Sequence, residues 1–155
     1  MKRPTSRLGA TALALLAALA VSACDDDPTS PGEDHHEPAG VRITMGGVTL
    51  VTVQGTNVTG TLTVAAGQET AHMGVVFLDE DGDPITPDDD EFLEVEIADE
   101  TVAEFEQDPP GEFGGHLHGV TAGTTTATFR LMHGTVGGSA HADYVSPAIT
   151  VVITE

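Results

Sequence analysis

Histidine and carboxylate side chains supply most of the chemistry that this sequence offers, and its seven histidines are not scattered at random. Two of them flank Leu117, as His116-Leu117-His118. Side chains alternate between the faces of a β-strand, so a core-facing Leu117 would turn both histidines toward solvent. His72 precedes Met73, which begins an alternating apolar run, and therefore also faces outward. If the two strands are neighbours in one sheet, three imidazoles converge on one exposed patch.

Such a patch predicts a zinc or copper site, because imidazole nitrogen is a ligand that suits both metals. A water molecule or a carboxylate from the next strand, Glu104 or Glu106, would complete the coordination. The alternative is that His72, His116 and His118 are ordinary surface histidines on a polar sheet face. The sequence leaves both interpretations open, since the convergence depends on the order of the strands.

A second pair of histidines, His133 and His141, flanks the glycine-rich stretch Gly134–Ser139. A hairpin at this stretch would bring the two imidazoles toward each other, near Tyr144. They are a further candidate for a two-ligand zinc or copper site. The alternative is that they are polar groups at the ends of a loop.

Three aspartates in an acidic turn, Asp79, Asp81 and Asp83, suggest calcium, which prefers oxygen ligands. An EF-hand loop needs glycine at its sixth position, whereas Gly82 is only the fourth residue counted from Asp79. The EF-hand motif therefore does not apply. A calcium site of another kind and a solvated turn both stay open.

Signatures of enzymes are missing from the sequence. The single cysteine is Cys24, and neither a G-x-S-x-G elbow nor a phosphate-binding glycine loop with lysine occurs. No spacing of histidine, serine and aspartate indicates a catalytic triad. We therefore expect no enzymatic activity.

The first 24 residues have the parts of a secretory signal. Lys2, Arg3 and Arg7 carry positive charge, an apolar run extends from Leu8 through Ala20, and small residues precede Cys24. The run is shorter than the roughly 20 apolar residues that span a bilayer. We therefore expect a cleaved signal and not a membrane span.

The same segment resembles a bacterial lipoprotein signal, with Cys24 at the lipobox position. The resemblance implies that residues 1–23 are removed and that Cys24 receives a lipid. It also implies a lipid-anchored protein of the bacterial cell envelope, on the periplasmic or extracellular face, with the membrane as a partner.

The composition is strongly acidic, with a net charge of −20. All 25 acidic residues follow the signal, whereas Arg42 and Arg130 are the only basic residues that do so. Such a surface repels nucleic acid and favours metal ions or basic partners, although it also serves simply for solubility. With Cys24 lipidated, no thiol remains for a disulfide, so the fold must depend on an aliphatic core.

Two regions follow the signal. Residues 24–40 are expected to be an acidic disordered tether, because prolines and acids leave no apolar periodicity. Residues 41–155 alternate between short Val-, Ile- and Thr-rich runs and turn residues, which predicts one all-β domain, an antiparallel β-sandwich. The expected strands are Val41–Met45, Val48–Val53, Val58–Ala65, Ala71–Leu78, Phe92–Ile97, Val102–Glu106, Gly115–Val120, Thr125–Met132 and Tyr144–Ile153.

Alternation within these strands predicts which side chains form the core. Arg130 has outward parity, and Glu94 and Glu96 on a neighbouring strand are its expected ion-pair partners. The side chains expected to face inward are Met73, Val75, Phe77, Leu93, Val95, Ile97, Ala127, Phe129, Leu131, Ile149, Val151 and Ile153.

Several short motifs between about Gly60 and Ile153 resemble a bacterial Ig-like domain, group 2 or a near relative. The motifs are Leu62-Thr63-Val64 with Gly67-Gln68, Phe77–Gly82, Glu100–Ala103, Gly119–Thr124 and Ala148–Val152. The resemblance implies an Ig-like β-sandwich, seven-stranded in the family and of about 7–9 strands here, used in adhesion, spacing or carbohydrate contact, without catalytic residues. The chain departs from the family pattern in lacking tryptophan and in an acidic insertion at residues 87–91. The segment Val41–Val53 is either an added hairpin or the true first strand.

Two hypotheses about function follow. The first is a non-enzymatic, membrane-tethered envelope lipoprotein that binds a protein or glycan partner, adheres or acts as a spacer. The alternative is an envelope lipoprotein that binds zinc or copper through its surface histidines.

Overall fold

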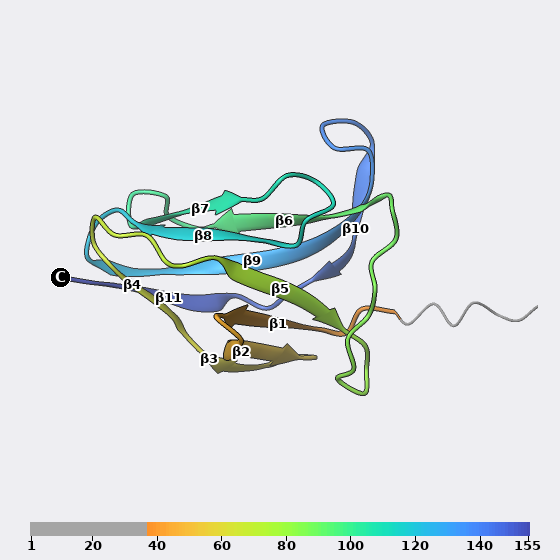
Figure 1. The fold of residues 1–155 in the computed structure, drawn as a ribbon, viewed down its shortest axis with the longest axis horizontal. Coiled ribbons are helices and arrows are strands. Elements are labelled where there is room, and N and C mark those ends of the chain that lie inside the picture. Colours follow the sequence, from red (N-terminus) through yellow and green to blue (C-terminus); the bar gives the residue numbers. More distant parts are fainter. Residues whose placement is uncertain (1–36) are drawn as a thin grey trace, which may run out of the picture. The chain divides into compact units, whose positions relative to one another are not determined.

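The computed structural model describes residues 37–155. Every regular secondary-structure element in this range is a β-strand (Figure 1). The predicted signal peptide, Cys24, and all of the predicted tether up to residue 36 lie outside the described residues. Within residues 37–155 there is no helix with the length and hydropathy needed to cross a bilayer. The strands are β1 (Gly40–Met45), β2 (Val48–Gln54), β3 (Asn57–Gly60), β4 (Leu62–Ala65), β5 (Met73–Leu78), β6 (Glu91–Ile97), β7 (Ala103–Gln107), β8 (Gly114–Gly119), β9 (Gly123–Gly134), β10 (Ala140–Val145) and β11 (Ile149–Thr154).

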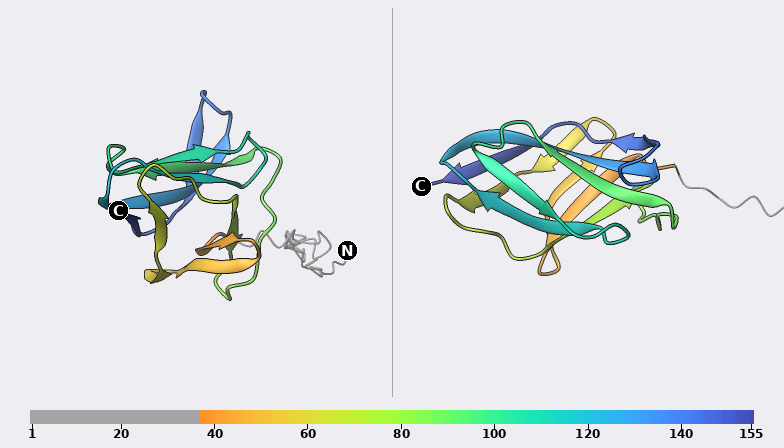
Figure 2. Two further views of the ribbon diagram at one scale, coloured as in Figure 1. Left: turned by 60° about the vertical axis from the view of Figure 1, so that its left-hand side comes forward. Right: turned by 90° about the horizontal axis from the view of Figure 1, so that it is seen from above.

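The strands form two sheets that enclose one core (Figure 2). One sheet has the order β3-β2-β1-β5-β8-β7, and the other has β10-β9-β11-β4 with β6 also paired to β9. The order β1-β5-β8-β7 opposite β6-β9-β11 is that of the ABED and CFG sheets of an immunoglobulin sandwich. The predicted all-β sandwich is therefore confirmed.

The structure has more strands than predicted because two expected strands are divided. The segment 58–65 breaks at Gly60, whose φ of +97° suits glycine and where a Cβ would lie 2.0 Å from the Leu50 carbonyl oxygen. β3 pairs with β2 in one sheet, while β4 pairs with β11 in the other. The β4–β11 pair is parallel, so the expectation of a wholly antiparallel sandwich is wrong at this pair.

The segment expected as Tyr144–Ile153 contains the end of β10 and most of β11, separated by Ser146, Pro147 and Ala148. Proline cannot donate to a ladder, so it favours the break. The Ser146 hydroxyl accepts a hydrogen bond from the Phe129 backbone N–H at 3.0 Å, which keeps the connection against β9.

The segment Val41–Val53 is both a first strand and a hairpin. β1 pairs with β5 on one side and with β2 on the other. Gly46 and Gly47 join β1 to β2, and their φ angles of 58° and 81° fit a type I′ turn. β2 and β3 therefore extend an Ig-like sheet at its edge.

The core is mainly aliphatic, as the composition requires. The predicted inward-facing side chains are buried, except that Val95 is half-buried and packs against the core. Phe77 and Phe129 are the largest fully buried side chains, with exposed fractions of 1% and 0%. The parity of the strands is thus fixed by burial, and it sets the direction of every outward-facing histidine.

Candidate metal sites

The first histidine cluster lies on β8. Leu117 is fully buried, so His116 and His118 point outward, each with a side chain 32% exposed. β8 pairs with β5 through Met73 opposite Gly115. The predicted neighbourhood of the two strands is therefore confirmed.

His72 lies just before β5 and contacts His116. The two ring centroids are 5.5 Å apart, with an angle of 72° between the rings. His72 Nε2 lies 2.7 Å from Asp108 Oδ2. Gly114 permits this approach, because a Cβ there would lie 2.8 Å from both the His72 ring and the Asp108 carboxylate.

His118 lies beside two carboxylates. Its Nε2 is 3.2 Å from Oε2 of Glu106 and 3.5 Å from Oε2 of Glu69. One ligand atom from each of these three side chains lies within 4.8 Å of the others. Glu106 is one of the two carboxylates expected beside the histidines, whereas Glu69 was not expected.

Glu69 reaches this cluster because its loop runs along β8. A single β-bridge joins Glu69 to His118, and the Thr70 N–H donates to the Leu117 carbonyl at 3.0 Å. His116 Nδ1 is 3.0 Å from the Thr70 carbonyl oxygen and 3.1 Å from Oε1 of Glu69. Each of the three imidazoles thus has oxygen partners, and His116 and His118 share the carboxylate of Glu69. A site built from all three stays a prediction.

The second histidine cluster lies where the β9–β10 hairpin closes. His141 stands directly opposite His133 in the register of the two strands. Their rings stack, with centroids 5.2 Å apart and 27° between the ring planes. Gly134 has a φ of +125°, and a Cβ there would lie 2.4 Å from the Ser139 carbonyl oxygen, so this turn needs glycine. The predicted hairpin is confirmed.

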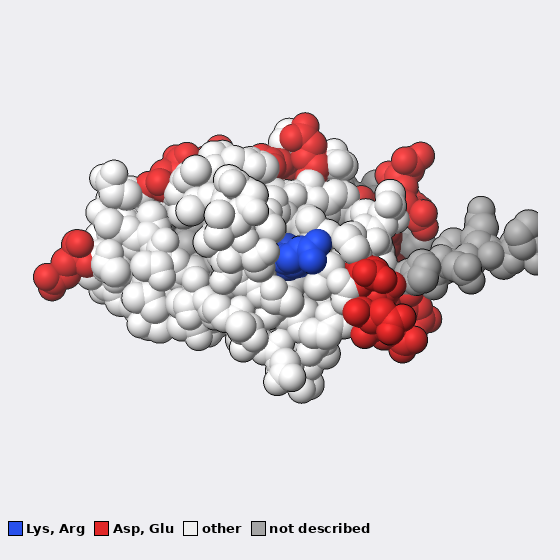
Figure 3. All heavy atoms as spheres, turned by 60° about the horizontal axis from the view of Figure 1, so that its bottom comes forward, with Lys and Arg blue, Asp and Glu red and all other residues white. Residues whose placement is uncertain are grey.

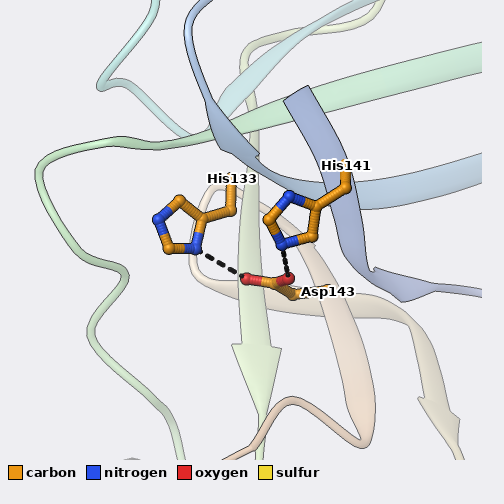
Figure 4. A group of neighbouring side chains, drawn as sticks. All are labelled: His133, His141 and Asp143. Carbon is orange, nitrogen blue, oxygen red and sulfur yellow. Dashed lines mark hydrogen bonds and ion pairs between the residues drawn. The ribbon is translucent and has the colours of Figure 1, made fainter. Parts of the chain in front are cut away.

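Asp143 bridges the two imidazoles (Figure 4). Its Oδ2 is 3.2 Å from His133 Nδ1, and its Oδ1 is 3.0 Å from His141 Nε2. Ligand atoms from the three side chains all lie within 4.8 Å of one another. Asp143 was not a predicted site residue, although its parity with His141 along one strand was a usable signal.

Asp90 holds the other side of the His133 ring. Its Oδ2 is 2.9 Å from His133 Nε2. The hydrogen bond and charge of Asp90, and then those of Asp143, raise the pKa of His133 above its ordinary value. Nothing in the sequence singles out Asp90 from the rest of its acidic loop.

Tyr144 follows this cluster but faces the core. Its side chain is 8% exposed, and its ring packs edge-on against Phe77 at 5.9 Å. Its hydroxyl has no hydrogen-bond partner within residues 37–155, and burial raises its pKa to about 12. Tyr144 thus supports the hairpin and is turned away from the imidazoles.

In the acidic turn that was predicted to bind calcium, the Asp79 carboxylate hydrogen-bonds to the backbone of the turn itself. Asp79 is 6% exposed, and its Oδ1 accepts hydrogen bonds from the backbone N–H groups of Asp81 and Asp83 at 3.0 and 2.9 Å. In the described part of the chain these three aspartates do not form a group with ligand atoms within 4.8 Å. A calcium site here stays a prediction.

Arg130 confirms its expected ion pairs on β6. Its Nη1 donates to Oε1 of Glu94 at 2.8 Å, and its Nη2 donates to Glu96. These groups line an open groove of about 570 Å³ together with Glu104 and Phe105. The groove is mainly acidic, because one guanidinium faces several carboxylates.

Charge is distributed unevenly over the domain. Figure 3 shows a face of the molecule that is mostly uncharged, with a single basic patch, while acidic groups gather toward its edges. The histidine clusters and the acidic groove are built mainly on β6 to β10. The two histidine clusters therefore lie on different sheets, the first on the sheet that contains β8 and the second on the sheet that contains β9 and β10.

Comparisons with known proteins assign no family to the chain. No family model matches it, and no curated protein matches it. One similar solved structure is that of domains 4 and 5 of the S-layer protein SbsC, with a TM-score of 0.41 and 20% sequence identity. The match covers 63% of this chain and 49% of the other, so it spans about half of that structure. A likeness of this degree says nothing about what the chain binds.

Proposed function

We propose that this chain is a non-enzymatic, lipid-anchored protein of the bacterial cell envelope, whose Ig-like β-sandwich acts in binding, adhesion or spacing. The observation that carries the proposal is the lipobox ending at Cys24, followed by a sandwich whose first strand begins at Gly40. A fully extended chain between these residues would span at most about 55 Å. A tether of this reach suits a domain that acts close to its membrane.

The surface suggests the kind of partner. The acidic groove around Arg130 would attract basic groups of a protein, and a glycan surface is the other candidate. Of the 25 acidic residues, five precede residue 37, so two arginines face 25 − 5 = 20 acids within 37–155. Nucleic acid is therefore disfavoured as a partner.

Lipid anchoring is tested by metabolic labelling with a fatty acid in a bacterial host, comparing the full chain with Cys24→Ser. The proposal expects label in the native chain and none in Cys24→Ser, with the variant moving to the soluble envelope fraction. Equal labelling and equal membrane association of the two proteins would overturn it. Ser22→Thr, two residues before the cysteine, is a control that should keep the label.

A second candidate function is zinc or copper binding by His72, His116 and His118. It is favoured by the β5–β8 pairing, which brings two of these imidazoles into ring contact, and by the carboxylates around His118. Titration calorimetry of a protein in which His35, His36, His133 and His141 are replaced by alanine isolates this cluster. Stoichiometric binding that is lost on adding His72→Ala and His118→Ala supports it, and binding unchanged by those two substitutions refutes it.

A further inference from the structure

We propose that the closing end of the β9–β10 hairpin is a zinc site in which His133 Nδ1, His141 Nε2 and a carboxylate oxygen of Asp143 bind the ion. Asp90 orients the His133 ring, and water takes the fourth position. The site goes beyond an envelope spacer or adhesion module, since neither needs a metal. It is also separate from the cluster on β8.

The distances between the three ligands suit zinc. Tetrahedral zinc with bonds of about 2.1 Å has ligands about 3.4 Å apart. The Asp143 oxygens already lie 3.2 Å from His133 Nδ1 and 3.0 Å from His141 Nε2. The three ligand atoms all lie within 4.8 Å, so small rotations of exposed side chains would complete the triangle.

The orientation of His133 is what a metal ligand requires. A ligating imidazole ordinarily donates its other N–H to a carboxylate or carbonyl, which fixes its tautomer. Asp90 Oδ2 lies 2.9 Å from His133 Nε2, on the ring nitrogen that does not face Asp143. With the Nε2 proton held by Asp90, the Nδ1 lone pair is directed at the proposed site.

The backbone fixes these ligands before a metal arrives. His133 and His141 are a directly opposed pair on two hydrogen-bonded strands, and Asp143 occupies the irregular position between Ala142 and Tyr144. Next to this shift in register, Tyr144 pairs with Leu131 on β9, and both side chains are buried. The site thus rests on the edge of the core and not on a free loop, which lowers the ordering cost of binding.

Exposure and charge also fit a bound dication. The His133 side chain is 40% exposed and that of His141 72%, so water can reach the fourth position. Asp90, Asp143 and Glu91, which stands opposite His133 on β6, contribute negative charge. Two imidazoles and one carboxylate favour zinc or copper over calcium or magnesium, which prefer oxygen ligands alone.

Titration calorimetry with zinc chloride tests the site in the full chain in detergent. Replacing His35, His36, His72 and His118 by alanine leaves the hairpin pair and His116 as the imidazoles of this reference protein. We expect one equivalent of zinc to bind. His141→Ala should lower the affinity at least about 100-fold, and Asp90→Asn about 10- to 100-fold, as loss of the carboxylate behind a ligating imidazole does.

Glu112→Gln is the control, since it removes one exposed carboxylate elsewhere and should leave the affinity unchanged. Circular dichroism should show that His141→Ala keeps its strands, because that side chain is largely exposed. Zinc binding that is equal in the reference protein and in His141→Ala would overturn the proposal, and so would a reference protein that binds no zinc.

Nitrogen NMR of the imidazoles gives a second readout. Zinc should shift the resonance of His133 Nδ1 while its Nε2 keeps a proton, and Asp90→Asn should remove that preference. A zinc-induced shift at Nε2 of His133, or none at either nitrogen, would contradict the proposed geometry.

Discussion

The two histidine clusters both lie on β-strands that pack against the core, but they arrange their imidazoles differently. On β8, His116 and His118 are two residues apart on one strand and both reach the carboxylate of Glu69, while His118 also contacts Glu106. At the hairpin, His133 and His141 face each other across two strands and share the carboxylate of Asp143. Within residues 37–155, the group of ligand atoms that lie within 4.8 Å of one another has one imidazole and two carboxylates on β8, but two imidazoles and one carboxylate at the hairpin.

The difference follows from strand geometry. Residues i and i+2 on one strand are about 6.6 Å apart, because each residue rises about 3.3 Å. Directly opposed residues on antiparallel strands have Cβ atoms only about 4.5–5.5 Å apart. A cross-strand histidine pair is therefore closer to chelating geometry than an H-x-H triplet, although the triplet is easier to see in a sequence.

The largest expected effect is on the free energy of unfolding, when a core side chain near either cluster is removed. Leu117 lies under the first cluster and Leu131 beside the second, and both are fully buried. Changing either to alanine should lower the free energy of unfolding by about 2–5 kcal/mol, measured by urea denaturation. A cost below about 1 kcal/mol for only one of them would mean that the two clusters do not rest on an equally packed core.

Zinc should stabilise the protein through the hairpin cluster and not through the cluster on β8. At a zinc concentration about 1,000 times the dissociation constant, a native-state site adds about 4 kcal/mol to the free energy of unfolding. We expect this gain in the native chain and in His72→Ala/His118→Ala, but not in His133→Ala/His141→Ala, by thermal denaturation with and without a chelator. A gain that follows His118 instead would reverse the comparison.

Tyr144 ties the hairpin to the core and should make its stability depend on alkaline pH. Its pKa of about 12 lies above the unfolded value of 10, so the unfolded chain loses its proton first. The stabilisation is complete below pH 10 and should be lost between about pH 10 and 12, by about 2–3 kcal/mol.

Tyr144→Phe should remove this dependence in alkaline denaturation curves. It should not destabilise the protein at neutral pH, because the hydroxyl has no partner within residues 37–155. An unchanged alkaline slope in Tyr144→Phe would show that another group controls it.

The smallest expected effect is on His133 itself. Its pKa is raised chiefly by Asp90, so its stabilising contribution is present below its unfolded value of about 6.5 and fades as pH rises through the folded value. Asp90→Asn should lower this pKa, as followed by NMR titration of the ring. Glu112→Gln should leave the pKa of His133 unchanged. An equal change of that pKa in both variants would mean that the overall negative charge of the protein raises it, and not the hydrogen bond to Asp90.

Much of the fold could be predicted from alternation. Met73, Phe77 and Phe129 are buried as expected, because a strand with one core face must place every second side chain inward. The same rule holds in the last strand, where Ile149 and Ile153 are buried. The division at Gly60 was missed, since local pattern does not show that a chain changes sheets there.

The site was predictable only in part, for a related reason. His133 and His141 were paired through the glycine-rich turn, which is a local signal. Asp90 and Glu69 were missed because they arrive from loops, and their positions depend on how distant segments cross the strands. Loop carboxylates in so acidic a chain cannot be ranked without the fold.

The most direct test of the zinc site is a crystal structure of the chain with one equivalent of zinc, using anomalous scattering at the zinc edge. The account predicts a peak about 2.0–2.1 Å from His133 Nδ1, His141 Nε2 and an Asp143 oxygen, with Asp90 still bonded to His133. A peak at His118 with Glu69 and Glu106, and none at the hairpin, would contradict it.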